Sequence, residues 1–230
     1  MVVRRSQLWL RCVTGLATAA FVALTCAAAG AAVKGPTDFV KDTRAKLDKI
    51  LAEPAATPGS KEETTHENKI REMVQRLFDF KELGIRSLDK HWATLKPAEA
   101  DEFLKTLGKL IENNYIYGLK NTGAYTMKYL GEEIVGTQAS VKTEITATPP
   151  KKKKPVTIAV EYRLVKDVKG EWRVYDIITD GDSLVDLYKA EFNKVIAKGG
   201  FPELLKKLKM KLESGDTGTA GTPTGSSSKP

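Results

Sequence analysis

Apolar residues recur at intervals of three or four positions in six segments of this chain, which is the spacing of one face of an α-helix. In the first segment, Phe39, Val40 and Leu47 share such a face, and Pro36 lies at its start. Two prolines and a glycine between residues 54 and 60 separate it from the second segment. The pattern predicts helices over residues 36–51, 62–78, 83–88, 97–114, 183–198 and 202–213.

The spacing changes to alternation in the middle of the chain. Tyr125, Met127 and Tyr129 alternate with polar residues, and three later runs repeat this pattern, which is typical of strands with one buried face. The predicted strands cover residues 125–129, 141–145, 158–164 and 172–176. We therefore expect an α+β fold, with helices packed on a four-stranded, twisted antiparallel sheet.

The N-terminus has the features of a secretory signal peptide. Arg4, Arg5 and Arg11 accompany an apolar stretch over residues 12–29, and small residues follow it. A membrane anchor is the alternative, but the stretch is marginal in length and rich in Ala, Thr and Gly. We expect export to the periplasm. The predicted parts are a cleaved signal peptide over residues 1–32, one domain over 33–213 and a disordered tail over 214–230.

Composition narrows the choice of partners. Cys12 and Cys26 both lie in the predicted signal peptide, so the mature chain has neither a disulfide nor thiolate chemistry. Removing the three arginines of the signal lowers the formal charge from +8 to +5. In an exported protein, this charge favours an anionic lipid headgroup or an acidic protein face over nucleic acid. We expect a monomer.

The polar residues give little support for catalysis. His66 lies among acidic residues, and His91 has no nucleophile near it in the sequence. Asp176 and three further aspartates follow the last strand, but apolar residues interrupt them, so Asp182 is expected to cap the next helix instead of binding a metal. We predict no catalytic residue, metal or cofactor. A hydrolase or isomerase that uses His91 or Asp176 stays open as an alternative.

Two basic features allow more than one interpretation. The run Lys151-Lys152-Lys153-Lys154 lies between two predicted strands and is typical of a solvated hairpin tip. It would equally suit an anionic membrane or an acidic partner. The segment 202–213 is basic and amphipathic, so it can pack on the core or dock on a membrane or partner.

An ordered set of aromatic and glycine residues resembles one family. Phe78-Asp79-Phe80 precedes Trp92, and residues 170–177 read Gly-Glu-Trp-Arg-Val-Tyr-Asp-Ile before Gly-Asp-Ser-Leu-Val and the pair Tyr188 and Phe192. This set resembles the MlaC family, also called the toluene-tolerance or Ttg2-type family, over residues 37–212. Two departures are Lys189, where the family often has arginine, and the four-lysine run.

The resemblance implies a periplasmic shuttle that holds phospholipid acyl chains in an apolar pocket between helices and a twisted sheet. It also implies exchange with an inner-membrane ABC transporter through its MCE-domain ring, and with an outer-membrane lipoprotein complex. The residues expected to line the pocket are Leu77, Phe80, Leu83, Leu88, Trp92, Phe103, Leu107, Leu110, Ile111, Tyr115, Val160, Tyr162, Trp172, Val174, Leu184, Tyr188 and Phe192.

The same apolar residues are compatible with an ordinary filled core. In that case the protein would be a non-catalytic interaction module that docks through its basic helix. If the pocket exists, a charged residue in place of Tyr162 or Val174 is expected to abolish lipid binding and leave the protein folded.

Overall fold

An antiparallel meander forms the base of the fold. The computed structural model describes residues 34–54, 56–122, 125–148 and 154–215. The strands, in sheet order, are β1 (Tyr125–Val135), β2 (Gln138–Ala147), β3 (Val156–Lys166), β4 (Trp172–Thr179) and the two-residue β5 (Asp182–Ser183). The predicted α+β class and the four main strands are confirmed. The fifth strand was not predicted, because two residues are too few to show alternation.

Two irregularities bend the sheet. The register of β1 against β2 shifts between Tyr129 and Gly131, and that of β3 against β4 shifts between Arg163 and Leu164. Such bulges increase the local twist of a strand pair. The sheet is therefore curved, and a helix laid along it can leave space beneath its side chains.

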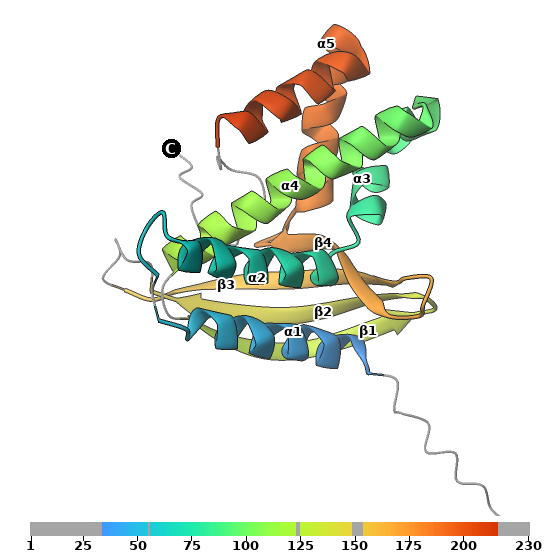
Figure 1. Cartoon of the computed structure of the whole chain (residues 1–230). Coiled ribbons are helices and arrows are strands. Elements are labelled where there is room, and N and C mark those ends of the chain that lie inside the picture. Colours follow the sequence, from blue (N-terminus) through green and yellow to red (C-terminus); the bar gives the residue numbers. More distant parts are fainter. Residues whose placement is uncertain (1–33, 55, 123–124, 149–153, 216–230) are drawn as a thin grey trace, which may run out of the picture. The chain divides into compact units, whose positions relative to one another are not determined.

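One helix packs near the β1 end of the sheet, and three others pack near the β4 end (Figure 1). Their bounds are α1 (Pro36–Leu51), α2 (Lys61–Leu77), α3 (Phe80–Leu88), the 3-10 helix η1 (Asp89–Thr94), α4 (Pro97–Thr122) and α5 (Leu184–Glu213). Helix α1 contacts β1 and β2, whereas α2, α3 and α5 contact β4. Helix α4 packs on α2, α3 and α5. No helix among the described residues is long and apolar enough to cross a membrane.

Helix α5 contains the break that the sequence predicts between residues 198 and 202. Gly200 has a φ of 74°, a left-handed conformation that a residue with a Cβ adopts only at a cost, and Pro202 follows it. The two predicted helices are therefore halves of one kinked helix. Leu204, Leu205 and Leu208 of the second half are buried, so its apolar face packs on the core.

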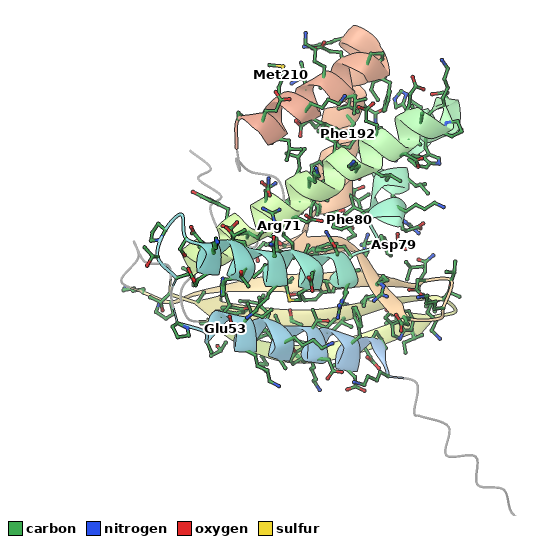
Figure 2. All side chains as sticks on the ribbon, in the orientation of Figure 1. Glu53, Arg71, Asp79, Phe80, Phe192 and Met210 are labelled. Carbon is green, nitrogen blue, oxygen red and sulfur yellow. The ribbon has the colours of Figure 1, made fainter. Side chains whose placement is uncertain are left out.

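Aromatic side chains fill the space between α3, α4 and α5. Phe103 is fully buried and meets Phe192 edge-on with ring centroids 5.7 Å apart, and Tyr188 stacks on Phe192 at 5.3 Å. Figure 2 places Phe80 and Phe192 beside α4. These contacts form a packed core among the helices that cover the β4 end of the sheet, away from β1.

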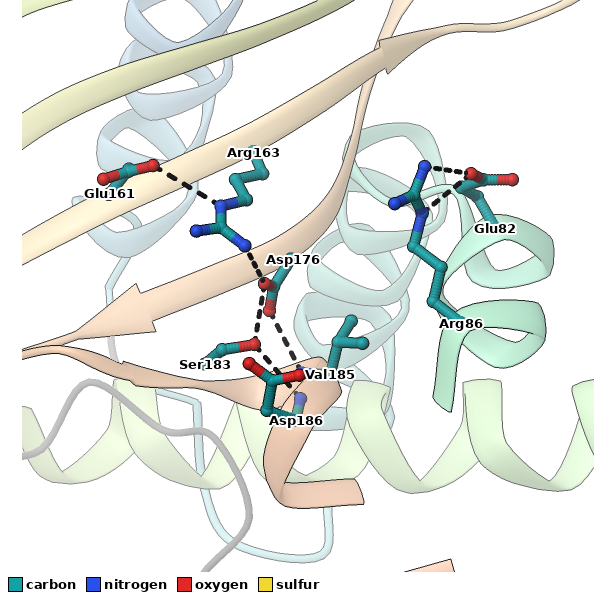
Figure 3. Close-up of polar contacts among 8 residues, drawn as sticks. All are labelled: Glu82, Arg86, Glu161, Arg163, Asp176, Ser183, Val185 and Asp186. Carbon is teal, nitrogen blue, oxygen red and sulfur yellow. Dashed lines mark hydrogen bonds and ion pairs between the residues drawn. The ribbon is translucent and has the colours of Figure 1, made fainter. Parts of the chain in front are cut away.

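A buried carboxylate fixes the start of α5 (Figure 3). The side chain of Asp176 accepts hydrogen bonds from the Ser183 hydroxyl at 2.8 Å and the Val185 backbone N–H at 3.1 Å, and lies 3.6 Å from Arg163 Nη1. Ser183, rather than Asp182, caps the helix, because its hydroxyl accepts from the Asp186 N–H at 3.1 Å. The expectation that Asp182 is the cap was wrong, since Asp182 pairs with Thr179 in the sheet.

Candidate functional site

A pocket lies between α1, the end of α4 and the curved sheet. The space between its lining atoms is about 840 Å³, which includes the part open to solvent. Its lining residues come from α1, α2, α4 and four strands: Val40, Thr43, Arg44, Leu47, Leu77, Tyr115, Gly118, Tyr125, Met127, Ile145, Ala147, Tyr162 and Ile177.

Local periodicity explains why these residues face one space. Val40, Thr43, Arg44 and Leu47 stand at the i, i+3, i+4 and i+7 positions of α1, which is one helix face. In the sheet, Tyr125 pairs with Ala147, Met127 with Ile145, and Tyr162 with Ile177. Because cross-strand partners, and residues two apart along a strand, share a face, these six side chains lie on the same face of the sheet.

The lining residues of the pocket differ in exposure, which divides it into a buried apolar inner side and a less buried outer side. Val40, Leu47, Leu77, Ile145 and Ile177 are each no more than 6% exposed. Tyr125, Met127 and Ala147, by contrast, are only partly buried. A ligand with a long apolar part and a polar end would match this division.

Arg44 supplies the positive charge of the pocket wall. Its Nε donates to Asp48 Oδ1 at 2.6 Å and its Nη2 to the Tyr125 carbonyl at 3.3 Å. The guanidinium carbon lies 3.7 Å from the centre of the Tyr125 ring, within the range of a cation–π interaction. Nη1 is buried and has no hydrogen-bond partner among the described residues.

Four tyrosines surround this charge. Burial raises the pKa of Tyr115, Tyr125, Tyr129 and Tyr162 above the ordinary value, and the Arg44 guanidinium opposes the shift in each. Their hydroxyls therefore stay protonated at neutral pH and can donate hydrogen bonds.

The structure separates the predicted lining residues into two groups. Leu77, Tyr115 and Tyr162 line the pocket. The other fourteen lie in the hydrophobic core or pack against it: Phe80, Leu83, Leu88, Trp92, Phe103, Leu107, Leu110, Ile111, Val160, Trp172, Val174, Leu184, Tyr188 and Phe192. The pattern of apolar residues does not distinguish a pocket wall from a filled core, because both select the same residue types.

Sequence reasoning missed Arg44 and the contribution of α1. The signal was present, since Val40, Thr43 and Leu47 share the predicted apolar face, and a charged residue one position after Thr43 interrupts it. The four-lysine run was a candidate docking feature. Lys151, Lys152 and Lys153 lie outside the described residues, and Lys154 is exposed.

The groups considered for catalysis have structural contacts. His91 Nε2 lies 2.8 Å from Asn193 Oδ1, and His66 Nε2 lies 2.9 Å from the Ile50 carbonyl. Asp176 is bound in the cap of α5. Among the residues that the structure describes, no group of three or more His, Cys, Asp or Glu side chains could hold a metal ion.

An apolar pocket on an α+β fold defines a candidate ligand-binding protein. The MlaC family model matches residues 41–210, and the chain belongs to this family. The resemblance read from the sequence is therefore confirmed, as is the expectation of a non-catalytic protein, because the family consists of non-catalytic lipid-binding proteins.

Two of the proteins that are similar to this chain illustrate the relationship. The intermembrane phospholipid transport system binding protein MlaC of Haemophilus influenzae is 22% identical over 125 residues, which cover 54% of this chain and 58% of the relative. This chain thus spans little more than half the length of that relative. A phospholipid-binding protein from Ralstonia solanacearum, solved in complex with a phospholipid, is 24% identical with a TM-score of 0.62, and the match covers 77% of this chain and 96% of that protein. This likeness supports the fold.

Proposed function

We propose that this protein is a periplasmic shuttle that binds phospholipid and carries it between an outer-membrane lipoprotein complex and an inner-membrane MCE-domain ABC transporter. The observation that carries the proposal is the pocket between α1 and the sheet, whose inner lining residues are apolar and buried. The phospholipid named for the relatives from Haemophilus influenzae and Ralstonia solanacearum supports the same ligand class.

Acyl chains provide enough affinity for this role without catalysis. Each buried methylene contributes about 0.8 kcal/mol, so two chains held against Val40, Leu47, Leu77, Ile145 and Ile177 would leave slowly into water. Release then requires contact with a partner or membrane that favours the open pocket.

The first test is native mass spectrometry with lipid extraction on the protein from residue 33 onward. We expect one diacyl phospholipid bound per chain, either co-purified or taken up from phosphatidylglycerol vesicles. An empty protein that takes up no lipid would reject the proposal and favour an interaction module with a filled core.

A pocket-filling variant locates the binding site. Ala147 lines the pocket on β2, so Ala147→Trp is expected to reduce bound lipid at least several-fold by occupying the space. Thr146 is its neighbour on the same strand, and its hydroxyl lies 2.7 Å from that of Thr157. Because Thr146 faces the opposite side of the sheet, Thr146→Trp is the matched control and should keep lipid. Equal loss in both variants would place the lipid elsewhere.

Transport between complexes needs its own test. Protein loaded with fluorescent phospholipid is mixed with liposomes that do or do not contain the MCE-domain transporter of the same bacterium. We expect faster transfer to the transporter liposomes, because the partner should open the pocket. Equal transfer to both would leave a lipid-binding protein and reject this partner.

The proposed compartment rests on the signal-like N-terminus, which lies outside the described residues. Osmotic-shock fractionation should release a chain that begins near residue 33. A full-length chain in the cytoplasmic fraction would reject the periplasmic location.

A further inference from the structure

One buried nitrogen in the pocket wall has no partner within the described part of the chain. Nη1 of Arg44 is buried without a hydrogen bond from these residues, although the other two nitrogens of the guanidinium are engaged. The side chain as a whole is 17% exposed. Leaving a charged donor buried and unpaired is costly, so natural structures rarely keep one without an acceptor.

The position of this group suggests its acceptor. Arg44 lines the pocket and pairs with Asp48, whose side chain is half exposed, whereas Leu47 and Leu77 of the inner side are buried. An amphiphile that fills the pocket would place its chains against the inner side. Its polar end would then lie beside the guanidinium.

We propose that Arg44 binds the phosphate of the bound phospholipid through Nη1, and that the protein therefore distinguishes phospholipids from neutral lipids with the same chains. This inference deepens the proposed function and rests on it. A guanidinium is well suited to the task, because its fixed donors match phosphate oxygens and it stays charged at every physiological pH.

The surrounding contacts fix the orientation of the Arg44 guanidinium before any ligand binds. Asp48 engages Nε, the Tyr125 carbonyl engages Nη2, and the Tyr125 ring lies against the guanidinium. Little side-chain freedom is then lost when an anion binds Nη1. Asp48 also offsets part of the positive charge, but its half-exposed carboxylate is screened by water.

A second cation lies near Arg44 on α1. Lys41 Nζ, one turn before Arg44 in α1, lies 5.2 Å from the centre of the Tyr129 ring. The protonated hydroxyls of Tyr115 and Tyr162, whose pKa values burial raises, are further donors along the same pocket. The pocket wall and the neighbouring Lys41 thus offer donors and positive charge to an anionic group.

The competing explanation is that Arg44 only fastens α1 to β1 through Tyr125. A test must therefore separate loss of phosphate recognition from loss of the pocket wall. The probe is a vesicle of phosphatidylglycerol with about one tenth diacylglycerol of identical acyl chains. The readout is the ratio of the two lipids extracted by the protein, divided by their ratio in the vesicle.

Arg86 provides a matched control. Its Nε donates to Glu82 at 2.8 Å, four positions earlier in α3, and its guanidinium carbon lies 4.2 Å from the centre of the Tyr175 ring. It therefore has the same two kinds of contact as Arg44, and it does not line the pocket. Figure 3 shows the Arg86–Glu82 pair.

We expect the wild type and Arg86→Gln to enrich phosphatidylglycerol over diacylglycerol about tenfold, the effect of one charged hydrogen bond. In Arg44→Gln the enrichment should fall towards one, with diacylglycerol uptake unchanged. Arg44→Lys keeps the charge and loses the fork, so it should retain part of the enrichment, and it serves if the glutamine variant does not fold.

Two results would overturn the inference and leave lipid binding in place. One is a wild type that extracts both lipids without preference. The other is an Arg44→Gln protein that keeps the wild-type ratio, whether its total lipid is normal or reduced. A wild type that extracts neither lipid would instead reject the proposed function itself.

Discussion

Two buried polar side chains, Asp176 and Arg44, differ in how completely their hydrogen bonds are satisfied. Both oxygens of Asp176 accept hydrogen bonds, and Arg163 stands beside them, so this residue has a structural role. Arg44 keeps one buried nitrogen that no described residue engages, and this is the observation behind the proposed phosphate contact.

Asp176→Ala should strongly destabilise the protein. The change leaves the Val185 N–H and the Ser183 hydroxyl without their acceptor and weakens the start of α5, so we expect a loss of about 2–4 kcal/mol in the free energy of unfolding. Urea unfolding measures it. Asp182→Asn, at an exposed position of β5, is the control and should change stability by less than about 0.5 kcal/mol. Losses of the same size in both variants would contradict the structural role of Asp176.

The buried tyrosines predict a loss of stability in alkali. Burial raises the pKa of Tyr162 in the folded protein above the value of about 10 in the unfolded chain. The free energy of unfolding is therefore unaffected by the ionisation of Tyr162 below about pH 10. It falls as the pH rises further, because the unfolded chain then releases the Tyr162 proton and the folded chain keeps it. Urea unfolding at pH 8 and pH 11 should show a fall that is smaller in Tyr162→Phe. An equal fall in both proteins would contradict the assignment.

At the scale of elements, two glycines of neighbouring helices differ in the space around them. A Cβ on Gly84 of α3 would lie 2.5 Å from Leu104 Cδ2 and 3.2 Å from Phe103 Cε1 of α4, so the two helices approach closely there. A Cβ on Gly108 of α4 would meet Phe80 at 3.7 Å, which is ordinary contact.

Gly108→Ala should therefore stabilise the protein by about 0.5–1 kcal/mol, since alanine is the better helix former and fits. Gly84→Val should destabilise it by about 1–3 kcal/mol through overpacking. Thermal and urea unfolding of both variants measure the difference. The same sign for both changes would contradict the close approach of α3 to α4.

The elements could be predicted from the sequence far better than the site. Apolar spacing located the helices and the four long strands, because it is a local property of the chain. It did not show that α1 faces β1, since Arg44 and Tyr125 are 81 positions apart and meet only through tertiary packing. It also placed the cap of α5 at Asp182 instead of Ser183. Aspartate and serine are both favoured capping residues, so residue type alone does not choose between two adjacent positions.

For the whole molecule, bound lipid should appear as added stability. A ligand present at about 100 times its dissociation constant adds about 2.7 kcal/mol, which corresponds to a rise in Tm of about 5–10 °C for a domain of this size. Differential scanning calorimetry of the delipidated protein, with and without phosphatidylglycerol vesicles, measures the rise. Ala147→Trp should show little of it, and a full rise in that variant would mean that the lipid acts outside the pocket.

The contacts between α1 and β1 affect the order in which the parts of the protein fold. Besides the contact of Arg44 with Tyr125, they include the Thr37 N–H, which donates to Glu132 at 2.8 Å across 95 positions. Closing so large a loop is entropically expensive and slow compared with forming a hairpin such as β2–β3. The wall of the pocket is thus expected to form late, after the sheet. A chain that is still folding would then have no complete pocket, so only the folded protein would bind an apolar ligand.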